Sequence, residues 1–459
     1  MLPASLYTPL YHHGMLLVVI GCALLYWDCQ NRAGSLTRFN RAAIVVIGVG
    51  MIVFIGFRPV NVAFVDMVDY AMVYERVQLG GASSSNDPLF NGLQRLCGQF
   101  LSTNGWFVVC AFIYVAPLAL AAWRVHGAWA FPVFLACLTA FSFWAYGVNG
   151  IRNGMATSVL LLAFAFHDKP VVMFPLMAAA WGFHGSTLLP TGAFLLVRYV
   201  KRTEIWLAFW VLCAVVSSVA GNAGEMLVAH YNPYASDDRI EKYIHGSNEE
   251  GGFRADFLAY SIVPVVGTLL LAGRTRARTR RLGARVGSWP GLNWMRSRRA
   301  LSAIGMGSGK RACAQGGRWD WGVASARLGG AGRGPSSGLA AAWESPGGRG
   351  LAAPQAKATP GASDRLPGVR LLRTDPFYAR LVNTYLLANA LWILVIHADQ
   401  SNRFAYLSWF MMPWVLLYPF VPGKVIHRPR TGLIAAILCG QYLFTYVMGV
   451  VINPLRGIL

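Results

Sequence analysis

Long apolar runs without a single charged side chain dominate this chain and restrict what it can fold into. These runs are residues 98–123, 125–151, 170–197, 205–224, 381–398, 404–423 and 431–455. A helix needs roughly 20 apolar residues to cross the hydrocarbon core of a bilayer, and only 13% of the residues in the chain are charged. Because a soluble domain could not cover so much apolar surface, the sequence predicts an all-α, polytopic membrane protein.

The distribution of Lys and Arg between the runs predicts how the chain crosses the membrane. No Lys or Arg precedes the first apolar segment, whereas Arg38 and Arg41 follow it, which is the reverse of a cleavable signal peptide. Since cytoplasmic loops collect Lys and Arg, about twelve segments with both termini outside fit the pattern. The predicted outer loops are residues 58–103, 147–153, 184–186, 222–256 and 399–403.

One region contains segments that are short for a membrane span. Residues 154–166, 170–183 and 187–197 would each form a straight helix shorter than the bilayer core. Joining the last two into one span would place the cluster Arg198, Lys201 and Arg202 outside, against the charge rule. We therefore expect three separate helices, broken or strongly tilted, which is a common way to build a binding site within a membrane protein.

Residues 274–374 differ in character from the rest of the chain. They supply most of the formal net charge of +21 and are rich in Gly, Ala, Arg, Ser and Pro, without helical or strand periodicity. This composition predicts a basic, low-complexity, disordered cytoplasmic loop. A nucleic-acid or anionic-lipid surface is the alternative, but the arginines are scattered, and no nucleic-acid partner is expected. The loop divides a membrane domain of about nine spans, residues 1–273, from the last three spans in residues 375–459.

The cysteines give no sign of a metal site or a disulfide framework. They are dispersed, mostly in apolar runs, and none forms a C-x-x-C pair. A free cysteine packs as a small hydrophobe. No metal or other cofactor is therefore predicted.

Two ionisable residues, Arg152 and His184, lie in otherwise apolar sequence of membrane length. Such groups are costly in a bilayer, so those that occur usually face a protein interior or a wet cavity. Arg152 precedes a predicted helix N-terminus, where a guanidinium and free N–H groups both suit a phosphate; the alternative is simple snorkelling to the interface. His184 is a candidate proton shuttle or hydroxyl ligand, and the alternative is a hydrogen-bonded packing role.

Acidic residues follow in the first predicted outer loop. The spacing of Asp66, Asp69 and Val73 places them along one helical face. An acidic pair beside Arg58, which ends the second span, can bind a sugar hydroxyl or deprotonate it. The alternative interpretation is a solvated loop helix whose acids form salt bridges with Arg58.

A further arginine, Arg403, begins a late span at the same predicted face. Arg58, Arg152 and Arg403 thus come from distant parts of the chain to one side of the membrane, and together they suit the diphosphate of a lipid carrier. The alternative is ion pairing with Asp399 and with the acidic loop at residues 225–250.

Several stretches together resemble the EpsG-type, Wzy-like polymerases of bacterial exopolysaccharide and O-antigen synthesis. They are GFRPVNVAFVDMVDY, DPLFNGLQRL, GIRNGMATSVLLLAFAF, GFHGSTLLP and SNRFAYLSWFMMP, and the resemblance covers residues 41–272 and 375–420. It implies a multi-pass protein of the bacterial inner membrane that joins repeat units carried on undecaprenyl diphosphate at the periplasmic face. The implied partners are the lipid-linked oligosaccharide, the bilayer and other membrane proteins of polysaccharide assembly.

The resemblance also implies roles for individual residues. It suggests a glycosyltransferase-like site with Asp69, His184 and Arg152 as catalytic residues and Arg58, Arg152 and Arg403 as substrate-binding residues. The position of Asp66 beside Arg58 makes Asp66 a further substrate-binding candidate. The sequence departs from the family at Asn153, where glutamine is common, and in residues 274–374, which have no counterpart. The alternative function is a transporter or flippase for lipid-linked sugars, or a non-catalytic export partner. A transporter would place its ionisable groups near the midplane and use internal repeats, and neither pattern is evident.

Overall fold

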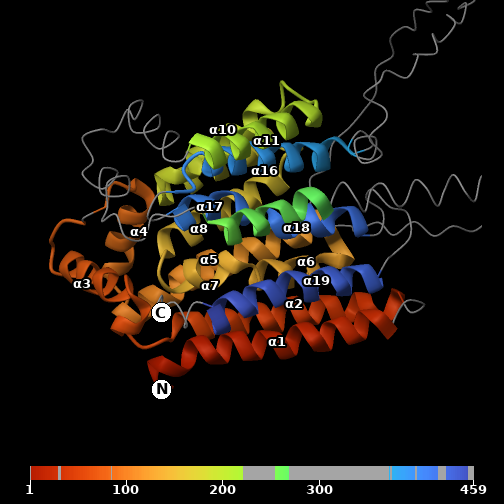
Figure 1. Cartoon of the computed structure of the whole chain (residues 1–459). Coiled ribbons are helices and arrows are strands. Elements are labelled where there is room, and N and C mark those ends of the chain that lie inside the picture. Colours follow the sequence, from red (N-terminus) through yellow and green to blue (C-terminus); the bar gives the residue numbers. More distant parts are fainter. Residues whose placement is uncertain are drawn as a thin grey trace, which may run out of the picture. The chain divides into compact units, whose positions relative to one another are not determined.

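We describe the chain from a computed structural model. It describes residues 2–28, 33–83, 85–220, 254–267, 375–397, 401–421 and 431–452, together with Leu372. All regular elements in these residues are helical (Figure 1), which confirms the predicted all-α fold. The predicted cytoplasmic loop at residues 274–374, apart from Leu372, and most of the predicted outer loop at residues 222–256 lie outside the described residues.

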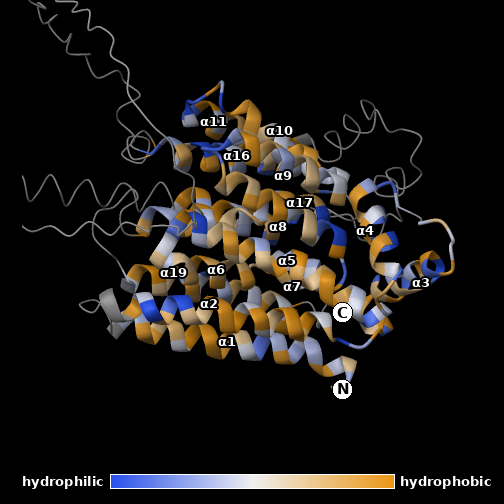
Figure 2. Ribbon diagram, turned by 180° about the vertical axis from the view of Figure 1, so that it is seen from behind, coloured by the Kyte–Doolittle hydropathy of each residue, from blue (hydrophilic) through white to orange (hydrophobic). Residues whose placement is uncertain are grey.

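Four helical stretches are long and apolar enough to cross a membrane. They are Ala4–Trp27, Leu36–Gly56, Thr103–Leu138 and Thr431–Ile452. Large apolar side chains such as Leu17, Val46 and Phe112 are exposed on their outward faces, and Figure 2 shows these helices as largely hydrophobic. Because lipid, and not water, stabilises such a surface, the prediction of a polytopic membrane protein is confirmed.

The main helices of these stretches are α1 (Ala4–Asp28), α2 (Ala33–Gly56), α5 (Thr103–His126) and α19 (Thr431–Tyr446). Helix α1 packs against α19 although the two lie at opposite ends of the chain. The Tyr442 hydroxyl of α19 donates a hydrogen bond to the carbonyl oxygen of His12 in α1. The first and last described helices therefore belong to one packed body.

The region of short predicted segments forms three separate helices, as the charge pattern predicted. They are α8, α9 and α10, at Ile151–Ala165, Pro170–Phe183 and Leu188–Leu196. Pro170 occupies the first turn of α9, where its missing N–H has no helical partner to lose. The short connections place the N-terminus of α8 and the C-terminus of α9 at the same end of the helices, which positions the site described below.

Two of the apolar runs differ from the single spans predicted for them. Residues 125–151 contain two helices, α6 (Ala130–Leu138) and α7 (Phe141–Val148). Residues 404–423 are likewise divided between α17 (Ser401–Trp409), which begins just before them, and α18 (Met412–Leu417). In the first break, the carbonyl oxygens of Leu138 and Thr139 accept hydrogen bonds from the hydroxyls of Tyr11 and Thr445, at 2.6 and 3.0 Å. Side chains from other helices thus replace the bonds that a continuous helix would supply.

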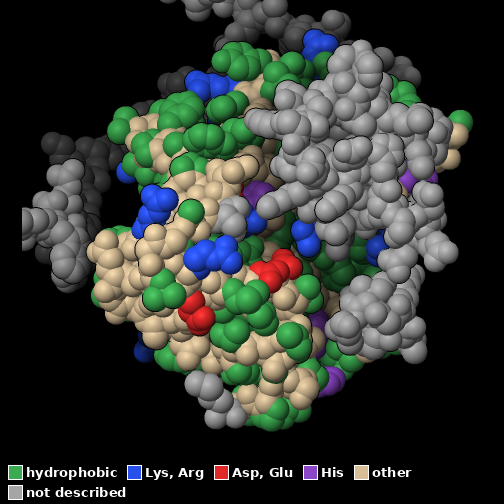
Figure 3. Space-filling view, turned by 90° about the vertical axis from the view of Figure 1, so that its left-hand side faces the viewer, with side chains coloured by type: hydrophobic (Ala, Val, Ile, Leu, Met, Phe, Trp, Pro, Cys, Tyr) green, Lys and Arg blue, Asp and Glu red, His purple; other side chains and the backbone are tan. Residues whose placement is uncertain are grey.

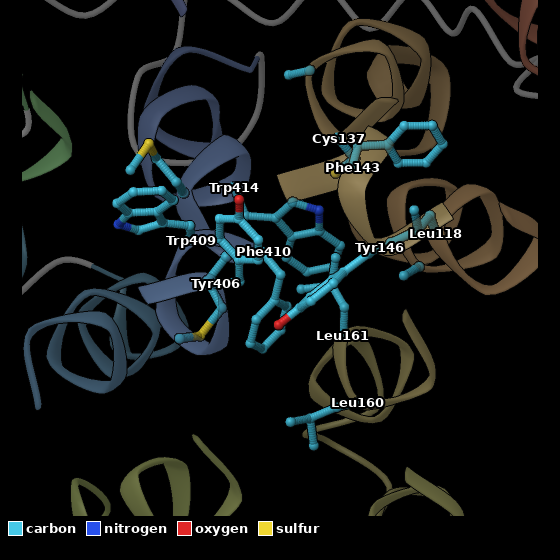
Figure 4. Packing of buried hydrophobic residues seen from close by; sticks show 14 of the residues in the cluster. Leu118, Cys137, Phe143, Tyr146, Leu160, Leu161, Tyr406, Trp409, Phe410 and Trp414 are labelled. Atoms are coloured by element: carbon cyan, nitrogen blue, oxygen red, sulfur yellow. The ribbon is translucent and has the colours of Figure 1, made fainter. Parts of the chain in front are cut away.

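The two broken helices pack against each other through aromatic side chains (Figure 4). The rings of Tyr146 in α7 and Tyr406 in α17 lie 5.2 Å apart and perpendicular, and Trp409 and Trp414 are fully buried beside them. Perpendicular aromatic pairs contribute about 0.5–1.5 kcal/mol beyond the burial of their area. This cluster holds the end of α7, and hence the start of α8, in a fixed place.

Two short helices, α3 and α4, lie at one end of the long helices (Figure 1, left). They are Met67–Gln78 and Pro88–Gly98, and Thr103 at the start of α5 donates a hydrogen bond to Glu75 of α3. The 24 residues of α5 span about 36 Å. At the far end of α5, Arg124 forms an ion pair of 2.6 Å with Asp168. The described predicted outer loops at residues 58–103, 147–153 and 184–186 thus lie near α3 and α4, and two predicted inner loops, those of Arg124 and Lys169, meet at the opposite end.

Candidate functional site

A cavity of about 390 Å³ opens between α3, α4 and the start of α8. Figure 3 looks onto this end of the molecule, where acidic and basic side chains lie next to each other. The cavity is lined by Asp66, Asp69, Tyr70, Met72, Val73, Arg76, Ser83, Ser85, Phe90, Gln94 and Arg152. The structure therefore brings three of the predicted site residues, Asp66, Asp69 and Arg152, to one cavity.

Arg152 lies in the first turn of α8 and is held by two other helices and the loop before α4. Its Nη1 donates to Asp87 Oδ2 at 2.6 Å, and its Nε donates to the Tyr70 hydroxyl at 3.3 Å. The guanidinium also lies near the rings of Tyr70 and Phe90, 5.9 and 5.8 Å from their centroids. The Arg152 side chain is 21% exposed, and its Nη2 has no hydrogen-bond partner among the described residues. One face of a fixed, permanently charged group thus remains for an anion in the cavity.

Asp87 connects the Arg152 site to a third part of the chain. While Oδ2 pairs with Arg152, Oδ1 accepts a hydrogen bond from the Gly185 N–H at 3.2 Å. Asp87 directly precedes Pro88 and has the extended backbone that a following proline favours. Asp87 was not predicted as a site residue, although it begins the stretch DPLFNGLQRL that contributes to the family resemblance.

A close approach between α4 and α9 places Asp87 beside Gly185. A β-carbon added at Gly182 would lie 2.8 Å from the Cβ of Leu89. Real Cβ atoms do not approach so closely, so only glycine lets the two helices meet at this distance. The glycine at this position therefore contributes to the geometry of the site.

His184 caps the C-terminus of α9, next to the Asp87–Arg152 pair. Burial lowers the pKa of the His184 imidazole to about 4, against the opposing influence of the Asp87 carboxylate. The positive charges of Arg152 and Arg403 lower this pKa further. The imidazole is therefore neutral near pH 7, and because Nδ1 accepts from the Ser186 N–H at 3.1 Å, its proton is on Nε2. In this state Nε2 can donate a hydrogen bond and is not a proton acceptor.

Ser186 ties the His184 loop to α8. Its hydroxyl donates to Asn153 Oδ1 at 2.9 Å, and Asn153 directly follows Arg152. Asn153, where glutamine is common in the family that the sequence resembles, thus links the start of α8, which carries Arg152, to the loop that carries His184.

Arg58 takes a different place from the one predicted. It is only 1% exposed and does not line the cavity formed by the described residues. Its Nη1 and Nη2 donate to the carbonyl oxygens of Ile55 and Val148, at 2.6 and 3.2 Å, and its guanidinium lies 5.2 Å from the Phe107 ring centroid. The alternative salt bridge to the loop acids is not formed within the described ranges, where no carboxylate pairs with Arg58. Its contact with Val148 fixes the chain just before α8.

Arg403 lies in the first turn of α17 and is exposed. Its charge acts on both Tyr70 and His184, so it lies near the cavity although it does not line it. Burial raises the pKa of Tyr70, and the charges of Arg152 and Arg403 oppose that shift. The Tyr70 hydroxyl therefore keeps its proton and can donate it to a ligand while it accepts from Arg152. The other predicted partner of Arg403, Asp399, lies outside the described residues.

The cavity also contains polar residues that the sequence analysis missed. Gln94 is fully buried, its Oε1 accepts from the Ser83 hydroxyl at 3.0 Å, and its Nε2 has no partner in the described part of the chain. Arg76, in the last turn of α3, adds a second cation to the lining. Carboxylates, an amide and hydroxyls beside aromatic rings can bind a sugar, while the arginines can bind a phosphate.

The comparison with known protein families gives a match for this chain. The EpsG family matches residues 41–282. The matched range contains Asp66, Asp69, Asp87, Arg152 and His184, but not Arg403. No curated protein and no solved structure matches the chain.

Proposed function

The chain belongs to the EpsG family, whose members have a polysaccharide-polymerase-like role, and from this premise we propose that it is a glycosyltransferase-like polymerase. In this proposal it joins repeat units carried on undecaprenyl diphosphate at the periplasmic face of the bacterial inner membrane, in exopolysaccharide or O-antigen biosynthesis. The observation that supports it best is one cavity that combines the two carboxylates Asp66 and Asp69 with the anchored guanidinium of Arg152.

In the proposed reaction, the bond between the anomeric carbon of the growing glycan and its lipid diphosphate breaks. A hydroxyl oxygen of the acceptor sugar forms the new glycosidic bond to that carbon, and the hydroxyl proton passes to the carboxylate of Asp69. The diphosphate leaves with the electron pair, and Arg152 stabilises the charge that develops on it. Arg76 and Arg403 add positive electrostatic potential, so that these two arginines and Arg152 together stabilise the departing diphosphate.

The remaining residues position substrate or the catalytic groups. Asp66, which is half-buried at the start of α3, accepts hydrogen bonds from sugar hydroxyls. His184 contributes the Nε2 hydrogen as a donor, so proton acceptance is assigned to Asp69. Asp87 and Arg58 do not contact substrate; Asp87 orients Arg152, and Arg58 fixes the chain before α8.

A deletion strain tests the proposed function against the alternative of a flippase or export partner. Loss of a polymerase is expected to leave single repeat units on their lipid carrier at the outer surface of the membrane, with polymer reduced to background. The lipid-linked repeat units are measured by mass spectrometry, and their side of the membrane is determined from their accessibility to a glycosidase added outside. Accumulation of the same units on the inner side only would contradict the polymerase and indicate a flippase.

A further inference from the structure

A second, larger cavity lies at the opposite end of the described helices. Its volume is about 900 Å³, and it is formed by the residues after α10, the start of α11 (Thr203–Ala220) and the start of α16 (Pro376–Ile393). Its lining includes His167, the neighbour of Asp168, which pairs with Arg124 at the far end of α5. It shares no lining residue with the candidate polymerase site, and it lies at the end predicted to face the cytoplasm.

The cavity is rich in cations that lack acidic partners. Arg198, Lys201, Arg202 and Arg380 line it, and none of the four forms an ion pair within the described ranges. Arg380 is close enough to Arg198 for the two positive charges to act on one another. Like charges repel, so an anion bound near both guanidinium groups would stabilise this arrangement.

Arg380 is held in place by contacts with α10. Its Nε donates to the carbonyl oxygen of Phe194 at 3.1 Å, and its guanidinium stacks over the Phe194 ring at 3.7 Å from the centroid. These contacts leave the buried Nη2 without any hydrogen-bond partner in the part of the chain that is described. A buried, unpaired N–H of a charged group is costly, and a phosphate oxygen would satisfy it.

The carboxylate of Asp375 does not neutralise the cluster. Its Oδ1 accepts from the N–H groups of Phe377 and Tyr378, both at 3.0 Å, and so caps α16. Its Oδ2 accepts from the Tyr418 hydroxyl at 2.8 Å. Asp375 therefore caps α16 and bonds Tyr418. A second carboxylate, Glu204, also lines the cavity, but the four cations outnumber the two carboxylates, so the positive charge of the cavity remains in excess.

Asn383 supplies an independent sign of a ligand. It lines the cavity, is 1% exposed, and its Oδ1 has no hydrogen-bond partner in the residues described. A ligand hydroxyl would satisfy this acceptor. The lining also contains apolar side chains, Val197, Leu372 and Phe377 among them, and these suit the first carbons of a lipid.

We propose that this cavity binds the headgroup of an anionic phospholipid that carries a free hydroxyl, such as phosphatidylglycerol, from the predicted cytoplasmic leaflet. Arg198 and Arg380 contact the phosphate, and Asn383 Oδ1 accepts from the headgroup hydroxyl. Lipid in this cavity links α10 and α11 to α16, the helix that begins the C-terminal part of the membrane body. The inference depends on the membrane character of the chain and not on the proposed polymerase reaction.

Lipid binding to the purified full chain tests this proposal without any activity assay. The protein in detergent is titrated with phosphatidylglycerol or with phosphatidylcholine, and native mass spectrometry counts the bound lipids. We expect one phosphatidylglycerol to bind in preference to phosphatidylcholine and Arg198→Gln to weaken it about ten-fold or more. Arg198 is an exposed residue after α10, so its replacement does not disturb the core. The matched control is Arg124→Gln, which removes one cation from the same end, and it should leave binding unchanged.

Two further measurements separate the sources of the phosphate and the role of the amide. Inorganic phosphate at millimolar concentration should not displace the lipid; full displacement would assign the cavity to free phosphate and overturn the lipid proposal. Asn383→Leu should still bind phosphatidic acid, which lacks the headgroup hydroxyl, but it should no longer bind phosphatidylglycerol in preference to phosphatidic acid. Equal binding in the wild type, Arg198→Gln and Arg124→Gln, or an equal loss in both variants, would also overturn the proposal.

Discussion

Replacement of Arg152 with alanine is expected to reduce polymerisation at least about 100-fold, as loss of a fixed group that stabilises transition-state charge does in other enzymes. The guanidinium lines the cavity and is anchored by Asp87 and Tyr70 through Nη1 and Nε, which leaves Nη2 for a ligand. Arg152→Lys should also lose most activity, because one ammonium cannot keep both anchors and still present a planar donor pair to a diphosphate. The measurement is the length distribution of polymer in a deletion strain that carries each variant.

The control for Arg152 is Arg124→Ala. Arg124 also forms an ion pair of 2.6 Å with an aspartate, but its side chain is 36% exposed and lies at the other end of α5. An exposed pair contributes little to stability, so this variant should make polymer of wild-type length. Because Arg152→Ala leaves Asp87 partly buried and unpaired, the amount of each variant in the membrane is measured in parallel. Polymer of wild-type length from a normal amount of Arg152→Ala would contradict the assignment.

Asp69→Asn is expected to lower polymerisation about 100-fold or more, because a neutral amide cannot take the proton of the acceptor hydroxyl. The isosteric change keeps the shape of the cavity and the position of α3. Asp66→Asn serves as the comparison: an amide oxygen still accepts hydrogen bonds from sugar, so a reduction of about ten-fold is expected. The rate of polymer formation is measured with purified variants at a fixed concentration of lipid-linked repeat unit.

The two aspartate variants also distinguish between the possible bases. If Asp66→Asn showed the larger loss and Asp69→Asn remained near the wild type, proton acceptance would belong to Asp66. If neither substitution changed the rate, the carboxylates of α3 would have no part in the chemistry, and the proposed proton transfer would be wrong.

Much of the membrane fold follows from the sequence, because the cost of charge in lipid acts on each segment separately. The apolar runs predicted the long helices, and the cluster at Arg198 correctly separated α9 from α10. The break between α6 and α7 could not be predicted in the same way. It contains no proline, and it is stabilised by Gln441 and Thr445, which bond to the carbonyl oxygens of Ala136 and Thr139 from the other end of the chain.

The site was predictable only in part, for a related reason. Arg152, Asp66 and Asp69 were found because ionisable groups in or beside apolar sequence are costly unless they act together. Asp87 was missed because its partners, Arg152 and Gly185, are 65 and 98 positions away. Arg58 was assigned to substrate on its charge, its place at the end of the second span and the family resemblance, none of which reveals that its guanidinium is buried against the carbonyl oxygens of Ile55 and Val148.

The central claim is that the cavity around Arg152 is where repeat units are joined. Purified protein in liposomes, supplied with repeat units on undecaprenyl diphosphate, tests this claim most directly, with product length and released lipid diphosphate as the two readouts. The wild type should yield chains of many units and release one lipid diphosphate for each unit joined, while equally folded Arg152→Ala should yield neither. Chains of equal length from both proteins would contradict the claim.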